Sequence, residues 1–234
     1  MRNPGQSLAD PARVKVQVWG RTLAQTLLDL LAPRRCLACE NSAPQAAEYC
    51  AECGQPEPLL DVARHIGSVP VFAGVRYVEP VVSAIHRFKY GSAPELSGPL
   101  ARLATRGSDL LGIEPGDVWV PVPLHPLRLA ERGYNQSALL ARELSRAAGG
   151  KLDARRLCRL RHTEQQAKRG RRGRSENVAG AFAVRRKASF APARVVLVDD
   201  VVTTGATLAA CIRALCAAGD QVVGCVSVAH AERG

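Results

Sequence analysis

Two adjacent carboxylates and the turn that follows them carry the clearest chemistry in this chain. Asp199 and Asp200 come directly after four apolar residues and lead into a turn that holds hydroxyl groups and a glycine. The turn consists of Thr203, Thr204, Gly205, Ala206 and Thr207. Amides and hydroxyls at the start of a helix bind anions, but the two carboxylates would repel a bare polyphosphate. A ribose 5-phosphate unit satisfies both features, because its hydroxyls donate to the carboxylates while its phosphate occupies the turn.

A different nucleotide motif or a chance helix cap would each account for this run less well than a ribose-phosphate site. The commoner nucleotide motifs do not compete, since the sequence has no Gly-x-x-x-x-Gly-Lys and no Gly-x-Gly-x-x-Gly after a strand. An ordinary strand, turn and helix with a polar cap is the second alternative. Such a cap needs one polar residue, whereas this run has five.

A buried strand and a helix must position these groups. Residues 195–198 are all apolar and mostly β-branched, which is typical of a central strand in a parallel sheet covered on both faces. We expect this strand to stop at the two carboxylates. Apolar residues then recur at helical spacing over Ala206–Ala218, so a helix is predicted there.

A second predicted strand, within residues 117–125, ends in an unusual turn. It leads into Pro121, Val122 and Pro123, and His125 follows them. Proline cannot extend the hydrogen-bonded ladder, so the two prolines stiffen the exit of the chain from the sheet. His125 is the one histidine that we expect near a ligand, and no histidine has the spacing of a metal ligand. The next helix is predicted over Gln136–Ala148.

Four cysteines near the N-terminus form two Cys-x-x-Cys pairs separated by ten residues. They are Cys36, Cys39, Cys50 and Cys53. Four thiolates describe a closed tetrahedral site for structural zinc. Four unligated thiols are the alternative, but this stretch has too few core-forming residues to fold without a metal. The remaining cysteines lie in apolar patterns and are predicted as core residues; they are Cys158, Cys211, Cys216 and Cys225.

Length and composition indicate one globular domain of ordinary size with an appendage. The chain has 234 residues, of which 47% are hydrophobic. No apolar run reaches the length of a membrane span, and Gln25 and Asp29 interrupt the apolar stretch that a signal peptide would need. We therefore expect a cytoplasmic protein, in which cysteines are more often metal ligands or buried residues than disulfides.

Nearly all of the net charge of +11 lies in one segment, 155–187, which has twelve Lys and Arg against two Glu. We call this segment the basic hood, because we expect it to close over phosphates. The alternative is a merely solvating loop. Seven of these cations are assigned to contact with phosphate or nucleic acid: Arg159, Arg161, Lys168, Arg169, Arg171, Arg172 and Arg174.

The remaining segments complete an α/β pattern. We expect a loose tail over 1–18, then a unit over 19–58 that joins a short amphipathic helix to the four cysteines, and a main domain over 65–234. Within that domain, strands are predicted over 69–78 and 221–229 and helices over 80–89 and 95–111. The helix over 80–89 ends in the motif His-Arg-Phe-Lys-Tyr-Gly, which a solvated helix end explains equally well.

Together these motifs resemble those of one family. The two cysteine pairs, the His-x-Phe-Lys-Tyr-Gly turn, Val-Pro-Val-Pro-Leu-His with Arg-Gly-Tyr-Asn-Gln after it, and Val-Asp-Asp-Val-x-Thr-Thr-Gly-Ala-Thr occur in one chain. The combination resembles the ComF family, also described as ComF/GntX. The resemblance runs from about residue 20 to the C-terminus. It implies a type I phosphoribosyltransferase fold, a Rossmann-like parallel sheet flanked by helices, with a small N-terminal zinc-ribbon-like module.

The resemblance also implies a ligand and roles for its contacts. The ligand is 5-phosphoribose pyrophosphate (PRPP), bound with Mg²⁺. Asp199 and Asp200 bind the ribose hydroxyls, 203–207 the 5-phosphate, and 121–125 lie along the pyrophosphate. The catalytic assignment is Asp199, Asp200 and Arg169, the last offsetting charge as pyrophosphate leaves.

For function, the resemblance implies natural competence and the handling of incoming single-stranded DNA, with a competence helicase as a further partner. Three classes stay open at this point. The chain is an enzyme that transfers the ribose to an unknown acceptor in base or nucleotide salvage, a DNA-processing factor that retains PRPP binding, or a PRPP-responsive regulator without catalysis. The low aromatic fraction of 4% argues against an extended base-stacking platform, so any DNA binding is expected to be electrostatic.

Overall fold

The computed structural model describes residues 34–44, 47–59, 61–161, 180–185 and 191–232, apart from the side chains of 106–108. The predicted tail, the amphipathic helix before Pro33 and the central part of the basic hood lie outside the described residues. None of the helices in the described part of the chain combines the length and the apolar character that a bilayer crossing requires.

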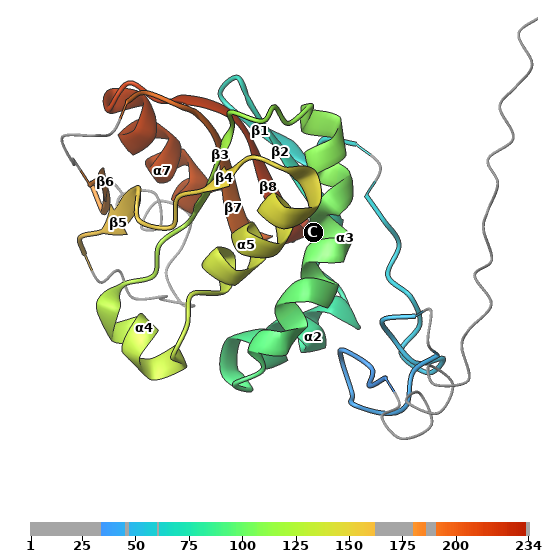
Figure 1. The fold of residues 1–234 in the computed structure, drawn as a ribbon. Coiled ribbons are helices and arrows are strands. Elements are labelled where there is room, and N and C mark those ends of the chain that lie inside the picture. The colour runs from blue at the N-terminus through green and yellow to red at the C-terminus, as the bar shows by residue number, and fades with distance from the viewer. Residues whose placement is uncertain (1–33, 45–46, 60, 162–179, 186–190, 233–234) are drawn as a thin grey trace, which may run out of the picture.

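A six-stranded, mostly parallel sheet forms the centre of the molecule (Figure 1). Its strands are β1 (Arg64–Ile66), β2 (Val69–Arg76), β3 (Val118–Pro121), β4 (Lys151–Leu152), β7 (Arg194–Val202) and β8 (Gln221–His230). They lie in the order β1-β2-β8-β7-β3-β4, and only β1 runs antiparallel to its neighbour. This arrangement confirms the predicted α/β class.

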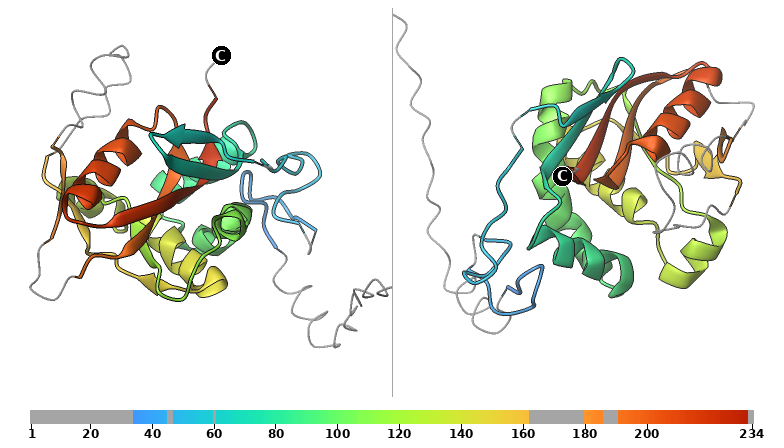
Figure 2. Two further views of the ribbon diagram at one scale, coloured as in Figure 1. Left: turned by 90° about the horizontal axis from the view of Figure 1, so that it is seen from above. Right: turned by 180° about the vertical axis from the view of Figure 1, so that it is seen from behind.

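Helices cover both faces of the sheet (Figures 1 and 2). They are α2 (Val81–Tyr90), the 3₁₀ turn η1 (Pro94–Leu96), α3 (Ser97–Leu111), α4 (Pro126–Arg132), α5 (Gln136–Ala148) and α7 (Ala206–Ala217). α2, α3 and α5 pack on one face. α7 packs on the other, beside an antiparallel hairpin of β5 (Leu157–Arg159) and β6 (Phe182–Val184).

Strand β7 is buried on both faces, as its sequence predicted. Val196 and Val198 contribute to the core cluster that contains α2, α3 and α5, whereas Val195 and Leu197 contribute to the cluster that contains α7. The prediction that this strand stops at the carboxylates was wrong. It continues to Val202, because pairing with β8 uses the backbone and does not depend on whether the side chains are polar.

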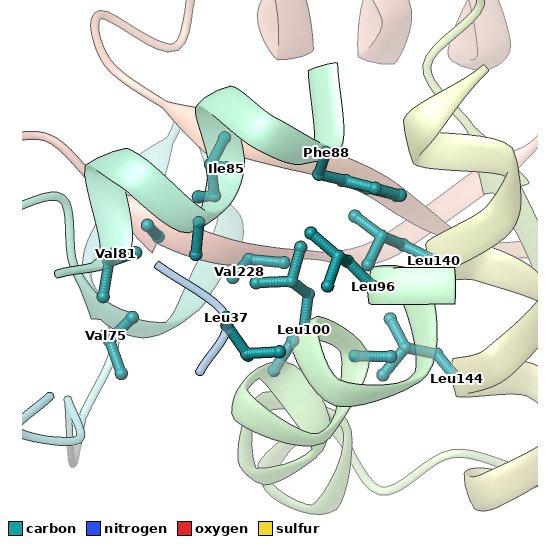
Figure 3. Packing of buried hydrophobic residues seen from close by; sticks show 14 of the residues in the cluster. Leu37, Val75, Val81, Ile85, Phe88, Leu96, Leu100, Leu140, Leu144 and Val228 are labelled. Carbon is teal, nitrogen blue, oxygen red and sulfur yellow. The ribbon is translucent and has the colours of Figure 1, made fainter. Parts of the chain in front are cut away.

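The described part of the cysteine module, residues 34–58, packs against the main core. Figure 3 shows the Leu37 side chain directed among the apolar residues that fill the space between α2 and α3. Arg87 on α2 fixes this contact, since its Nη1 donates to the carbonyl oxygens of Cys36 (3.3 Å) and Leu37 (2.6 Å). Arg102 on α3 adds an ion pair to Glu48 at 2.5 Å. The module therefore shares its interior with the sheet domain.

Two expectations about burial need correction. The basic hood was expected to close over phosphates or to be a solvating loop, yet part of it belongs to the core. Arg156 is buried and donates from Nε to Asp220 at 2.8 Å, and Leu157 and Phe182 are core residues. The ion pair and the hairpin explain how this end of the hood enters the fold. Among the cysteines predicted to be buried, Cys216 is exposed, because it follows Leu215 on the outward face of α7.

Candidate functional site

A cavity of about 310 Å³ lies at the carboxyl ends of β7 and β3, the edge where parallel α/β sheets bind ligands. Eight of the site residues predicted from the sequence line it: Val122, Pro123, His125, Arg159, Asp199, Asp200, Thr203 and Thr207. Leu124, inside the predicted turn 121–125, lines it as well. Seven further residues line it that were not assigned to the site from the sequence: Tyr77, Lys89, Arg128, Arg132, Gln136, Ser137 and Val201. The cavity thus brings the acid pair (Asp199 and Asp200) together with both turns.

The two members of the acid pair have different partners. Asp200 is 8% exposed and forms an ion pair from its Oδ1 to Lys89 Nζ at 2.8 Å. Asp199 accepts hydrogen bonds at Oδ1 from the hydroxyl of Ser137 (3.1 Å) and from the amide of Asp200 (2.9 Å). The partner of Asp200 thus lies on α2, and that of Asp199 lies at the start of α5.

Burial and neighbouring charges shift the pKa values of both Asp199 and Lys89. Burial raises the pKa of Asp199 to about 7, and the neighbouring charge of Asp200 adds to this, although Lys89 acts in the opposite direction. Burial alone would lower the pKa of Lys89, but the charges of Asp200 and Asp199 outweigh it and raise that pKa above the ordinary lysine value. Near pH 7, Lys89 is therefore cationic, whereas Asp199 is present in both its protonated and its ionised form.

The phosphate turn, residues 203–207, begins α7. Gly205 has a φ of +75°, a left-handed conformation that suits glycine, and a Cβ there would lie 3.0 Å from Cδ1 of Ile66. Within the turn, the amide of Ala206 donates to Oγ1 of Thr204 (3.2 Å). Arg64 on β1 donates from Nη1 to the carbonyl oxygen of Thr203 (2.9 Å), so β1 braces the turn from outside.

The proline turn, residues 121–125, is held by backbone and side-chain hydrogen bonds. The amide of Val122 still donates to the carbonyl oxygen of Val198 (2.9 Å), one residue beyond the end of β3. Asn135 donates from Nδ2 to the carbonyl oxygen of Val122 (3.0 Å) and caps α5 by accepting from the amide of Ser137 (3.1 Å). His125 caps α4 through Nδ1, which accepts from the amide of Leu127 at 3.3 Å. The proline turn and the start of α5 thus form one hydrogen-bonded unit.

The rest of the predicted site residues lie beside the cavity or outside the described residues. Pro121 is buried at the end of β3, and Thr204, Gly205 and Ala206 form the backbone of the phosphate turn. Arg161 is exposed and does not line the cavity. Arg159 does line it, with its guanidinium 5.5 Å from the centroid of the Phe182 ring. The further hood cations, Lys168, Arg169, Arg171, Arg172 and Arg174, belong to the part of the chain that the structure does not describe.

The four N-terminal cysteines converge as the sequence predicted. The sulfur atoms of Cys36, Cys39, Cys50 and Cys53 all lie within 4.8 Å of one another, and those of Cys39 and Cys50 are 3.6 Å apart. Burial alone would raise the pKa of Cys36, but backbone amides, that of Cys39 foremost, lower it to about 6. Four thiol ligands at this separation fit a tetrahedral metal such as zinc, with no coordination position left open for catalysis.

Comparison with known proteins agrees with this geometry. Residues 134–234 match the Phosphoribosyl transferase domain family. Together with the mostly parallel sheet and the site at its carboxyl edge, this match defines a phosphoribosyltransferase-type domain, which follows an N-terminal module whose cysteine cluster fits a zinc ribbon.

The relatives narrow the class to a family. The chain is 35% identical over 182 residues to Competence protein F of Haemophilus influenzae, covering 74% of each chain. It is 32% identical to the DNA utilization protein YhgH of Salmonella typhimurium and 31% identical to that of Escherichia coli K12, covering 74% of this chain and 80% of each relative. The chain belongs to the ComF family.

Proposed function

We propose that this chain binds PRPP together with Mg²⁺ and acts in natural competence, in the uptake of DNA and the processing of single-stranded DNA. The observation that carries the proposal is the meeting of the acid pair, the phosphate turn and the proline turn on one cavity. The names of the relatives, Competence protein F and DNA utilization protein, support the process. The phosphoribosyl transferase match supports the ligand class.

The cavity suggests a distribution of roles over the ligand. Asp199 and Asp200 would accept hydrogen bonds from the ribose hydroxyls, and the phosphate turn would hold the 5-phosphate. The proline turn would lie along the pyrophosphate. The carboxylate oxygens of the acid pair are ligands of the type that Mg²⁺ takes, although most of its coordination would come from the pyrophosphate and water. When bound, the ion would offset the charge of the pyrophosphate.

The match to a transferase domain favours a second candidate, an enzyme that transfers the ribose from PRPP to an acceptor. The residues of the cavity do not identify that acceptor. A scan for PRPP-dependent release of pyrophosphate, with bases, nucleosides and oligonucleotides offered in turn, tests both candidates. Release with a base or nucleoside supports a salvage-type enzyme, and release with an oligonucleotide supports a nucleic-acid substrate. PRPP binding without release supports a regulator.

Asp199→Asn is expected to weaken PRPP binding by about 10- to 100-fold, because a charged hydrogen-bond acceptor for the ribose is lost. The same variant should be more stable at pH 8, by about 2 to 4 kcal/mol. The pKa of Asp199 is raised to about 7 in the folded chain, so its ionisation removes stability as the pH rises from about 4 to about 7. Calorimetric titration and thermal unfolding at pH 5 and pH 8 measure the two effects.

Asp109→Asn is the matched control, because Asp109 is exposed on α3 and does not line the cavity. It should leave both PRPP affinity and stability unchanged. Equal PRPP affinity in wild type and Asp199→Asn would remove Asp199 from the ribose contact. A binding-deficient variant that still supports DNA uptake in cells would separate the site from competence and count against both an enzymatic and a regulatory role in that process.

Neutralising four arginines of the basic hood is expected to lower affinity for single-stranded DNA and to flatten its salt dependence. The residues to replace by glutamine are Arg169, Arg171, Arg172 and Arg174. Each lost phosphate contact should reduce the slope of log affinity against log salt by about 0.7 for single-stranded DNA. Fluorescence anisotropy at several salt concentrations measures the slope. A slope equal to that of wild type would exclude these arginines from the DNA contact.

A further inference from the structure

The first residue of α5 holds a buried hydrogen-bond donor that faces the cavity. Gln136 is 1% exposed and lines the cavity. Its Oε1 accepts from Nη1 of Arg132 at 3.1 Å, whereas its Nε2 has no hydrogen-bond partner among the described residues. Buried polar groups are almost always paired. A buried donor that lines a cavity therefore indicates an acceptor on a ligand.

The orientation of this amide follows from its neighbour. A guanidinium offers donors only, so the oxygen of Gln136 must face Arg132, since a turned amide would bring N–H groups against N–H groups. Arg132 is held in turn by Tyr90, whose hydroxyl accepts from Nη2 at 3.2 Å and whose ring centroid lies 4.8 Å from the guanidinium carbon. Tyr90 and Arg132 thus fix Nε2 as the group presented to the cavity.

The chemistry around Nε2 selects an anionic ligand group. The Nε of Arg132 is also buried without a partner in the described part of the chain, and Arg128 lines the same cavity. Two unpaired donors and a second guanidinium need a group that only accepts hydrogen bonds and carries negative charge. Phosphate oxygens have both properties.

The position of Gln136 indicates which phosphate group of the ligand its amide would contact. Its neighbour Asn135 binds the proline turn through the carbonyl of Val122, and its other neighbour, Ser137, binds Asp199. Gln136 therefore lies between the proline turn and the acid pair, whereas the phosphate turn begins α7 on the opposite face of the sheet. We infer that Gln136 and Arg132 form a diphosphate-binding pair in which the Gln136 amide donates to the pyrophosphate group of PRPP. This inference rests on the proposed function.

Titration of the full-length chain with three ligands in the presence of Mg²⁺ tests the pair. Gln136→Met should weaken binding of PRPP and of inorganic pyrophosphate by about 10-fold, and should leave the affinity for ribose 5-phosphate within about twofold of wild type. Gln136→Glu is the second variant, because its carboxylate still accepts from Arg132 and maintains the local fold. Its negative charge faces the diphosphate, so the affinity for PRPP and for pyrophosphate should fall by at least about 30-fold. Gln221→Met, at an exposed glutamine, is the control.

Several results would overturn the inference. Unchanged affinity for pyrophosphate and PRPP in both variants would show that the amide contacts neither. An equal loss for ribose 5-phosphate would show that it acts through Ser137 and Asp199. With a single-stranded oligonucleotide as a fourth ligand, a loss of affinity confined to it would assign the pair to a nucleic-acid phosphate. Failure of the proposed function would look different, because wild type would then bind neither PRPP nor ribose 5-phosphate. In that case, an affinity for pyrophosphate that depends on Gln136 would still support the anion site. A pyrophosphate affinity that is the same in wild type and the Gln136 variants would overturn it.

Discussion

Lys89→Met is expected to lower the free energy of unfolding by about 3 kcal/mol and the melting temperature by about 6 to 12 °C. Lys89 and Asp200 are 2.8 Å apart, with 18% and 12% of their side chains exposed, so the pair is shielded from water. Removing the ammonium group takes away the ion-pair partner of Asp200 and leaves its carboxylate beside that of Asp199. Thermal and urea-induced unfolding at pH 8, where Asp199 is ionised, should show the loss in full.

A double-mutant cycle separates the ion pair from simple packing. Lys89→Met with Asp200→Asn should recover part of the stability that Lys89→Met loses, because the uncompensated carboxylate is then absent. Lys151→Met, at an exposed lysine of β4, is the control and should change stability by less than about 0.5 kcal/mol. Lys89 also lowers the pKa of Asp199, so its loss should move the pH dependence of PRPP binding to higher pH. Strictly additive effects in the cycle would show that the two side chains do not interact.

Lys89 also shows where prediction from the sequence reaches its limit. The acid pair and the phosphate turn are adjacent in the chain, so their joint chemistry can be read without knowing the fold. The partner of Asp200 lies on α2, more than half of the main domain away in sequence. A lysine in the last turn of a helix is ordinarily explained by the helix dipole, and no local pattern distinguishes that role from an ion pair with a distant strand.

Element prediction succeeded where hydrophobic periodicity was strong. The predicted bounds of α5 coincide with the observed Gln136–Ala148, and β7, β8 and β2 overlap the ranges in which strands were predicted. The three-residue strand β1 and the helix α4, which buries no residue, were missed. Neither element has regularly spaced buried apolar residues, so the sequence carries no periodic signal for them. The hydrogen bond from Arg64 to the phosphate turn was also missed, because Arg64 lies on the strand β1 that was not predicted.

Ser137 and Gln136 illustrate a different limit. Both stand at the start of a helix that was predicted correctly, where a polar residue is normally explained as a cap. The actual cap is Asn135, which leaves the two following side chains free to reach the site. Burial of a glutamine to 1% is the property that distinguishes it from a solvated helix start, and burial depends on the packing of α5 against β3 and β7.

Removing the metal that the cysteine cluster is expected to hold should destabilise the chain by at least about 4 kcal/mol, because structural zinc contributes its binding free energy to folding. Freshly purified protein should contain one zinc per chain by elemental analysis. Treatment with a chelator, or Cys36→Ser, should lower the melting temperature by more than about 8 °C. Cys216→Ser is the matched control, because Cys216 is exposed on α7 outside the cluster. Much less than one metal per chain, with an unchanged melting temperature after chelation, would contradict a structural metal.

The loss of stability on metal removal should extend beyond the cysteine module, because the module packs against α2 and α3. Leu37 packs between α2 and α3, and Arg87 on α2 donates to the carbonyl oxygens of Cys36 and Leu37. The same helix carries Lys89. Hydrogen exchange should therefore increase along α2 as well as in the module after chelation, and PRPP affinity should fall although none of the four cysteines lines the cavity. Arg87→Met should reproduce the increased exchange in α2 while the zinc content stays at one per chain. If exchange increases in residues 34–58 alone, the module and the ligand site are energetically independent.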